Sequence, residues 1–333
     1  MTARTELVVE ITRGDLVESV HRVAACAVDA KGVILDATGD VDSPVYLRSA
    51  AKPFIAAAVI AAGADTAFGL DGREVAVMAA SHAGEPMHVE AVRSILNKIG
   101  MSVADLKCGV HWPYDEAAAE ALRRAGAAPT ALHNNCSGKH AGILALCKLI
   151  GADTVSYLDV ANPAQRQILA LCARVSNDDP ATWPLGIDGC GIPVYATSLR
   201  NAARSFARLA TLDDVSDSDA RALRVVRDAM VAHPVYVAGT GQFDTELMTV
   251  GAGSILSKGG AEGVHGVAAV AEGFGFVSKV LDGASRARAP SSIAILRRAG
   301  ALDDVQVQTL DRFAHPKVYN RAGHAVGEIR AAI

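Results

Sequence analysis

A serine and a lysine stand three residues apart in the segment RSAAKP, at residues 48–53. The apolar run FIAAAVI, which follows this segment directly, favours a buried helix. Proline is tolerated only in the first turn of a helix, so Pro53 predicts that the helix begins close to Ser49. Residues three apart lie one turn apart on the same helix face. The spacing therefore predicts a hydroxyl nucleophile at Ser49 and a basic partner at Lys52, at the positive end of a helix.

Lys52 can accept a proton only in its neutral form. A free lysine has a pKa of about 10.4, and lowering it to about 7 requires roughly 3–4 units, or on the order of 4–5 kcal/mol. Burial in an apolar helix start and a second nearby cation would both act in this direction. The alternative is a serine that caps a helix and an ordinary surface lysine. The motif taken alone does not decide between them.

Two further segments carry groups of the same kind. ASHAGE, at 80–85, leads from an apolar run into a helical pattern and places Ser81 at an element boundary. SKGG, at 257–260, follows a predicted strand and resembles the Lys-Thr-Gly strand of penicillin-recognising enzymes. The alternatives are a helix cap at Ser81, a packing histidine at His82 and a lysine before a glycine turn at Lys258. In chain order the three segments resemble the Ser-x-x-Lys acyl-transfer enzymes, and the missing Ser-Asp-Asn element counts against β-lactamase activity.

The six cysteines are scattered along the chain, at Cys26, Cys108, Cys136, Cys147, Cys172 and Cys190. Such spacing does not indicate the disulfide framework of a small secreted domain. Cys147 and Cys172 fall inside helical apolar patterns and are predicted to be core residues.

Cys136 and Cys190 lie instead in glycine-rich segments, NNCSGKHAG and GIDGCGIP. With His140 and Asp188 nearby, they could supply ligands for a zinc ion. Two free thiols in tight turns are the alternative. Neither segment fits a P-loop or a dinucleotide fingerprint.

Composition narrows the class of protein. The 333 residues are 50% hydrophobic and 20% charged, with a net charge of −4. The nearest approach to a basic cluster lacks interleaved aromatics and consists of Arg286, Arg288, Arg297 and Arg298. A solvated helix face explains it better than a nucleic-acid surface, so we expect no nucleic-acid partner. The start MTARTELVVEITRGD lacks the pattern of a secretory signal, and the apolar stretch 54–64 is too short to span a bilayer. We expect a soluble, cytoplasmic protein with no membrane partner.

The order of elements predicts the fold class. The first forty residues read as strands, in LVVEI, VHRVAACAV and VILDA, with a turn at 29–32. Helical patterns then dominate, at 49–62, 86–99, 115–125, 137–150, 163–175, 196–209 and 217–232. Strand patterns return in VYVAG, SILSKGG, GVAAV and GFVSKV, followed by a helix around 290–300 and a hairpin, KVYNRAGHAVGEI.

Strands at both chain ends most economically pair into one antiparallel sheet that helices cover. We therefore predict an α/β (α+β) protein. It forms one composite domain over residues 1–333, and a helical subdomain at about 86–232 is left open.

Five segments in this order resemble the class 3 (rhizobial-type) L-asparaginases of the L-asparaginase II family: YLRSAAKP, ASHAGE, NNCSGKHAG, DGCGIP and LSKGGAEG. NNCSGKHAG is the most specific of them, and HPVYVAGTG at 233–241 extends the similarity over nearly the whole chain. The resemblance implies a fold similar to serine β-lactamases and glutaminases, a homodimer, and hydrolysis of L-asparagine to L-aspartate and ammonia. All these segments precede Glu328, soon after which this sequence ends, whereas the family is longer.

The resemblance also implies roles for individual residues. The paired catalytic groups are Ser49 with Lys52 and Ser81 with Lys258. The residues that match the zinc ligands are Cys136, Lys139 and Cys190, and Lys139 rests on the resemblance alone. The positions at or beside the substrate pocket are Arg48, His140 and Asp188. Which serine attacks stays open, and the zinc ion is expected to shape the pocket or orient the substrate.

Two other functions stay open. The same Ser-x-x-Lys chemistry could act on glutamine, a β-lactam or a small ester. A zinc-dependent protein that binds an amino acid without catalysis is the other. The presence of both serines and both lysines argues against that second function.

Overall fold

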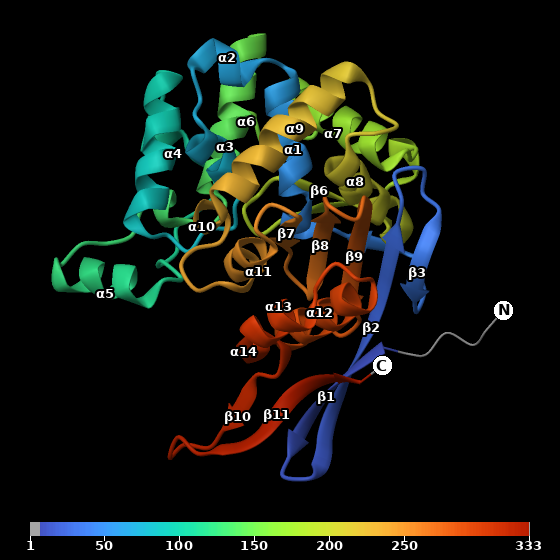
Figure 1. Ribbon diagram of the computed structural model, residues 1–333. Coiled ribbons are helices and arrows are strands. Elements are labelled where there is room, and N and C mark those ends of the chain that lie inside the picture. The colour runs from blue at the N-terminus through green and yellow to red at the C-terminus, as the bar shows by residue number, and fades with distance from the viewer. Residues whose placement is uncertain (1–6, 333) are drawn as a thin grey trace. The chain divides into compact units, whose positions relative to one another are not determined.

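The computed structural model describes residues 7–332 (Figure 1). The amino-terminal residues 1–6, part of the segment considered for a secretory signal, lie outside the described residues. Contacts divide the chain into two compact units. The first, here the sheet unit, comprises Met1–Ala50, Thr197–Asp214 and Glu246–Ile333, and the second, the helical unit, comprises Ala51–Ala196 and Val215–Thr245. The predicted single domain with a helical subdomain at 86–232 stays a prediction.

The sheet unit is built on an antiparallel sheet with the strand order β10-β11-β1-β2-β9-β8-β7, and β3 also pairs with β2. The strands are β1 (Leu7–Arg13), β2 (Leu16–Val28), β3 (Ile34–Thr38), β7 (Ile255–Gly259), β8 (Val264–Ala269), β9 (Phe274–Val280), β10 (Lys317–Tyr319) and β11 (Ala325–Ala332). At its centre β2 pairs with β9, and β1 pairs with β11 in a register that sets Val8 opposite Ala332. The two ends of the chain therefore share one antiparallel sheet, which confirms the prediction.

Helices cover both faces of this sheet. A methyl group placed on Gly266 of β8 would lie 2.2 Å from the ring of Phe206, in α8 (Leu199–Thr211). The preceding strand residue, His265, hydrogen-bonds instead with Ser292 of α12 (Arg288–Arg298), at 2.7 Å. Because successive strand residues point to opposite faces, α8 and α12 pack on opposite sides of the sheet. The predicted α+β class, with an antiparallel sheet covered by helices, is confirmed.

The helical unit packs around α1. Its helices are α1 (Lys52–Ala61), α2 (Ala64–Phe68), α3 (Gly72–Met78), α4 (Pro86–Lys98), α5 (Glu116–Arg124), α6 (Ser137–Ile150), α7 (Pro163–Ser176), α9 (Asp217–Ala232) and α10 (Pro234–Val237). Helices α6, α7 and α9 all contact α1, and nine of its ten residues are buried, as expected for a helix that is apolar all round. Short strands β5 (Leu185–Ile187) and β6 (Pro193–Ser198) form a hairpin.

The remaining elements are short. They are β4 (Pro44–Tyr46), α11 (Phe243–Gly251), α13 (Asp304–Thr309) and α14 (Asp311–Ala314). Of these, α11 lies across the boundary between the two units along the chain.

Most predicted helices lie where the structure has them. The helices predicted at 137–150 and 217–232 coincide with α6 and α9. The strand predicted at VYVAG is wrong, because its first residues form the helical turn α10. Pro234 occupies the first position of that turn, where a missing N–H costs nothing. Helix α3 went unpredicted, although Asp71 and Glu74 form a capping box that marks its start.

Candidate active site

Lys52 is the first residue of α1 and is 1% exposed. Its amine Nζ donates to the carbonyl oxygen of Ala80 at 2.5 Å, to the hydroxyl of Ser81 at 3.0 Å and to the carbonyl oxygen of Asn135 at 3.3 Å. Burial lowers the pKa of Lys52, and the charge of Lys139 lowers it further, while the Cys136 thiolate acts against both. The site thus holds a buried amine beside a serine hydroxyl, as acid–base chemistry requires.

Ser81 lies in the loop between α3 and α4, and its neighbour His82 is fully buried behind it. The Gly84 N–H donates to His82 Nδ1 at 3.2 Å, so Nδ1 carries no proton. His82 Nε2 must then donate to the Ser137 hydroxyl, 2.9 Å away. Burial holds the pKa of His82 well below its usual value, so the ring is neutral. His82 therefore joins the Ser81 loop to the start of α6, which is the packing role considered for it from the sequence.

The start of α6 gathers the groups that were predicted to hold zinc. Lys139 Nζ donates to the sulfur of Cys190 at 2.9 Å and lies 3.9 Å from a carboxylate oxygen of Asp188. Cys136 and Cys190 also hydrogen-bond to each other, and all three predicted ligands are buried. The hydrogen bond from Cys190, with the charges of Lys52 and Lys139, holds the pKa of Cys136 well below its usual value. These contacts favour the thiolate form of Cys136.

These side chains fit a zinc ion in their chemistry. Two cysteine sulfurs are ligands that zinc prefers, and the Asp188 carboxylate lies beside Lys139. Within residues 7–332 no three His, Cys, Asp or Glu side chains form a metal-binding group, so a three-ligand site requires Lys139.

Glycines let α6 approach α3 closely. A methyl group on Gly138 would lie 2.1 Å from the carbonyl oxygen of Val77, and one on Gly142 would lie 2.7 Å from the sulfur of Met78. Real Cβ atoms do not come this close to backbone, so position 138 requires glycine. This close packing sets the residues before α6 beside the end of α3, where Asn135 reaches Lys52.

His140 follows Lys139 in α6 and is fully buried. Its Nδ1 is 2.7 Å from the hydroxyl of Tyr157, which in turn accepts a hydrogen bond from the backbone N–H of Lys107 at 2.7 Å. The other ring nitrogen, Nε2, has no hydrogen-bond partner among the described residues. His140 thus contributes a buried polar atom that no described residue satisfies.

In the sheet unit, Arg48 and Ser49 lie in a 3-10 turn (Arg48–Ala51) that leads directly into α1. Arg48 has a φ of +51°, in the left-handed region that non-glycine residues rarely occupy. Strained backbone of this kind concentrates at functional sites. The helix begins at Lys52, so Pro53 lies in its first turn as predicted.

Lys258 lies inside β7 rather than after a strand, is fully buried and donates from Nζ to the carbonyl oxygen of Gly259 at 2.7 Å. A methyl group on Gly260 would lie 2.7 Å from the carbonyl oxygen of Leu47. The chain directly after Lys258 therefore packs against the turn that carries Ser49. The sheet unit brings these two predicted segments together.

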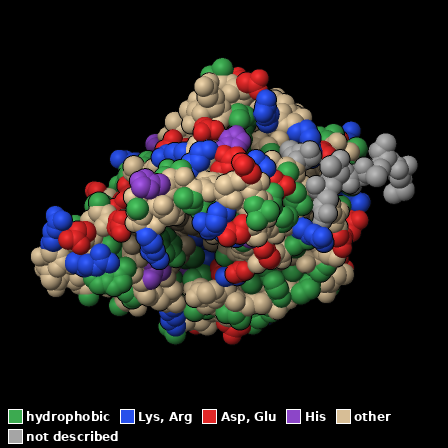
Figure 2. Space-filling view, turned by 90° about the horizontal axis from the view of Figure 1, so that it is seen from below, with side chains coloured by type: hydrophobic (Ala, Val, Ile, Leu, Met, Phe, Trp, Pro, Cys, Tyr) green, Lys and Arg blue, Asp and Glu red, His purple; other side chains and the backbone are tan. Residues whose placement is uncertain are grey.

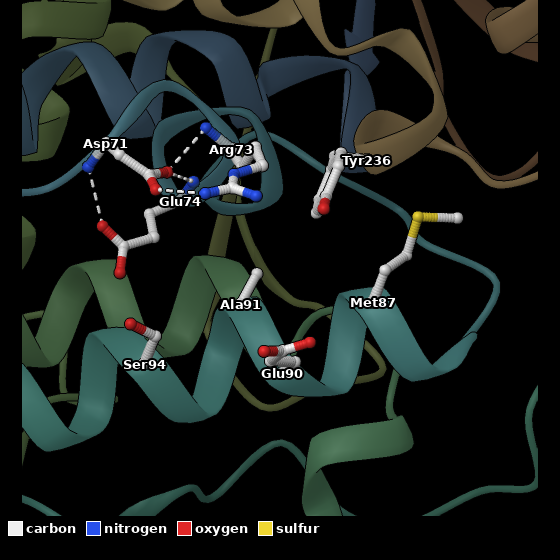
Figure 3. Close-up of a pocket in the computed structure, with 8 residues that line it drawn as sticks. All are labelled: Asp71, Arg73, Glu74, Met87, Glu90, Ala91, Ser94 and Tyr236. Carbon is white, nitrogen blue, oxygen red and sulfur yellow. Dashed lines mark hydrogen bonds and ion pairs between the residues drawn. The ribbon is translucent and has the colours of Figure 1, made fainter.

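A separate pocket of about 120 Å³ lies between α3 and α4 (Figure 3). It is lined by Asp71, Arg73, Glu74, Met87, Glu90, Ala91, Ser94 and Tyr236. The Asp71 carboxylate accepts from the N–H groups of Arg73 and Glu74, and the Glu74 carboxylate accepts from the N–H of Asp71. These polar groups cap the start of α3. None of the predicted site residues lines this pocket.

Charges of both signs are interspersed over the face shown in Figure 2. Members of the arginine cluster have partners within the sheet unit: Arg297 pairs with Asp304 at 2.9 Å, and Arg298 pairs with Asp36. No helix among the described residues combines the length and apolarity needed to cross a membrane.

A comparison with known protein families identifies the family of the chain that carries these side chains. A family model described as L-asparaginase II matches residues 9–331. The chain belongs to the L-asparaginase II family. The resemblance inferred from the sequence is thereby confirmed, and the match covers all five motif segments of this asparaginase-family chain.

Other comparisons add less. No curated protein matches the chain. A solved structure titled "Crystal structure of Mglu in its native form in the presence of 4.3M NaCl" is similar with a TM-score of 0.36 and 15% identity. The alignment covers 84% of this chain, which spans 61% of the length of that one.

Sequence reasoning missed two groups and one hydrogen bond at this site. Asn135 contributes its backbone carbonyl to Lys52, an interaction for which residue type carries no signal. Tyr157 is a lone tyrosine in an irregular segment and reaches His140 only through the fold. The hydrogen bond from His82 to Ser137 had a local clue, since both residues belong to motif segments.

Proposed function

We propose that this protein is an L-asparaginase that hydrolyses L-asparagine to L-aspartate and ammonia. The observation that carries the proposal is the buried amine of Lys52, hydrogen-bonded to Ser81 and three residues from Ser49 in the chain. Membership in the L-asparaginase II family supports an amidohydrolase acting on a small molecule. Burial lowers the pKa of Lys52 toward the range in which a lysine can act as a base.

The proposed reaction is a double displacement. Ser49 attacks the side-chain amide carbon, and Lys52 takes the hydroxyl proton. The C–N bond then breaks, and ammonia leaves with a proton that passes from Lys52 through Ser81. Water hydrolyses the aspartyl ester to release L-aspartate and restore the serine. Backbone N–H groups near the start of α1 would stabilise the oxyanion, at about 2.7–4 kcal/mol per donor.

Lys258 is the proposed partner of the second serine, Ser81. Two lysines that act on one substrate would repel each other, which would help at least one of them to be neutral. Which serine attacks depends on which lysine is neutral when substrate binds. The hydrogen bond between Lys52 and Ser81 supports a relay in which both serines exchange protons with Lys52.

A zinc ion would be held by Cys136, Lys139 and Cys190. When bound, it would supply a fixed positive charge that orients the substrate and shapes the pocket. The amine of Lys139 would have to be neutral to act as a ligand, although the nearby Cys136 and Cys190 sulfurs now favour its charged form against the effect of burial. A homodimer is proposed on the family resemblance.

Recognition of L-asparagine requires groups of both signs, because the substrate is a zwitterion. Arg48 would bind its carboxylate through the guanidinium fork, and Asp188 would bind its ammonium group. His140 adds a neutral hydrogen-bonding group. A glutaminase or another small-amide hydrolase would use the same groups with a larger pocket.

The test is ammonia release from L-asparagine by the wild type and by Ser49→Ala, with circular dichroism to show that both are folded. Release by the wild type that is lost in Ser49→Ala supports the proposal. No release by folded wild type refutes the asparaginase assignment, and a panel of glutamine, a β-lactam and small esters then tests the alternatives. Binding of asparagine without turnover of any amide or ester would favour the non-catalytic binding protein.

A further inference from the structure

The Tyr157 hydroxyl is held between a backbone donor and a histidine. It accepts from the Lys107 N–H at 2.7 Å and lies 2.7 Å from His140 Nδ1, all within the helical unit. The backbone N–H can only donate, so the phenolic oxygen must accept there. Among residues 7–332, the phenolic proton then has one acceptor within reach, the lone pair of His140 Nδ1.

These two hydrogen bonds of the Tyr157 hydroxyl favour one tautomer of the His140 ring. If Nδ1 carried the proton, it would also donate to Tyr157, and the buried phenolic proton would be left without an acceptor. The unprotonated Nε2 would at the same time be an orphaned acceptor. The opposite tautomer leaves a single orphan, the Nε2–H group. Since each unsatisfied buried polar group costs about 1–3 kcal/mol, the Nε2–H tautomer is favoured.

His140 Nε2 is a fully buried polar atom with no partner among the described residues. We propose that Tyr157 is a positioning residue that holds His140 in the Nε2–H tautomer, so that His140 donates a hydrogen bond to an oxygen of the bound substrate. This rests on the proposed function and extends it. His140 Nε2 is therefore neither a metal ligand nor a general base, because both roles require its lone pair.

The chain offers a matched pair of variants. Tyr157→Phe removes the hydroxyl that selects the tautomer and keeps the ring. Tyr195→Phe removes a hydroxyl that is also buried in the helical unit but has no hydrogen-bond partner among the described residues. We expect the KM for L-asparagine to rise about three- to tenfold in Tyr157→Phe, with little change in kcat, and to stay unchanged in Tyr195→Phe.

Nitrogen NMR of protein labelled at the histidine rings reads the tautomer directly, and His140→Gln assigns the signals. The wild type and Tyr195→Phe should show a protonated Nε2 and an unprotonated Nδ1, and Tyr157→Phe should show a mixture. A protonated Nδ1 in the wild type, or identical His140 signals in Tyr157→Phe, would overturn the proposal.

Addition of L-asparagine to folded Ser49→Ala protein tests the substrate contact without turnover. We expect the Nε2 signal of His140 to shift as an oxygen acceptor reaches it. An unchanged signal at saturating asparagine would mean that a fixed water satisfies Nε2, and would overturn the substrate contact. If the wild type proves inactive on asparagine, the tautomer measurement still decides the role of Tyr157, so the two failures are distinguishable.

Discussion

The amine of Lys52 lies 3.0 Å from the hydroxyl oxygen of Ser81, although 29 positions separate them in the sequence. The contact joins the first residue of α1 to the loop after α3. The carbonyl oxygens of Ala80 and Asn135 also accept from the amine, and Cys136 hydrogen-bonds with it, so the position of the amine is fixed. An amine fixed in this way can exchange a proton with a serine without first reorienting.

Replacing Lys52 should abolish turnover even where charge is kept. We expect Lys52→Arg and Lys52→Met each to lower kcat/KM for L-asparagine by at least about 100-fold, because a guanidinium cannot lose its proton in a protein. Ammonia release measures the effect, and thermal melts show whether each variant is folded. Near-normal turnover by Lys52→Arg would mean that the site needs a cation there and not a base.

Activity should rise with pH. The neutral amine of Lys52 is the active form, and burial lowers its pKa below the ordinary 10.5. The neutral fraction therefore grows as pH rises through this lowered pKa, and kcat/KM should increase and then level off. Initial rates across about pH 6 to 10, at constant ionic strength, measure the profile. A flat profile in protein that stays folded throughout would contradict a lysine base.

Cys136 and Cys190 should determine how much zinc the protein binds. We expect purified protein to contain zinc, measured by elemental mass spectrometry, and Cys136→Ser and Cys190→Ser to lose most of it. Cys172→Ser is the control, since this thiol lies in α7, and burial raises its pKa to about 12. In the zinc-depleted variants KM should rise more than kcat falls. Complete loss of kcat in folded Cys136→Ser would indicate that the metal takes part in the chemical step.

Gly138→Ala and Gly142→Ala, which each add a methyl group to α6, should destabilise the helical unit by different amounts. Gly138→Ala meets the rigid carbonyl of Val77, whereas Gly142→Ala meets the flexible side chain of Met78. We expect the first to lower the unfolding free energy by about 1–3 kcal/mol or more, and the second by less. Urea unfolding followed by circular dichroism gives both values. Equal midpoints for the two variants would show that the helix moves freely away from α3.

The sequence predicted the elements better than the contacts of the site. Periodicity located α6 and α9 to the residue because both are long, and Gly151 marks the end of α6 while Ser216 caps the start of α9. The turn at Pro234 was missed because a short apolar run looks the same in a strand and in a helical turn. The motifs identified Lys52, Ser81 and Cys190 individually. Their partners could not be read, because spacing says nothing about groups that the fold brings together from distant segments.

The pairing of β1 with β11 has a consequence for synthesis on the ribosome. Strand β1 is synthesised before β11, and the paired residues Glu10 and Arg330 lie 320 positions apart, so one edge of β1 stays unpaired while the residues between them are translated. Contacts of such sequence separation slow folding, and an unpaired strand edge invites association with other chains. The sheet unit, which contains Ser49 and Lys258, can complete its sheet only after β11 has been translated. The yield of folded protein in cells should therefore depend on what covers the unpaired edge of β1 until β11 pairs with it.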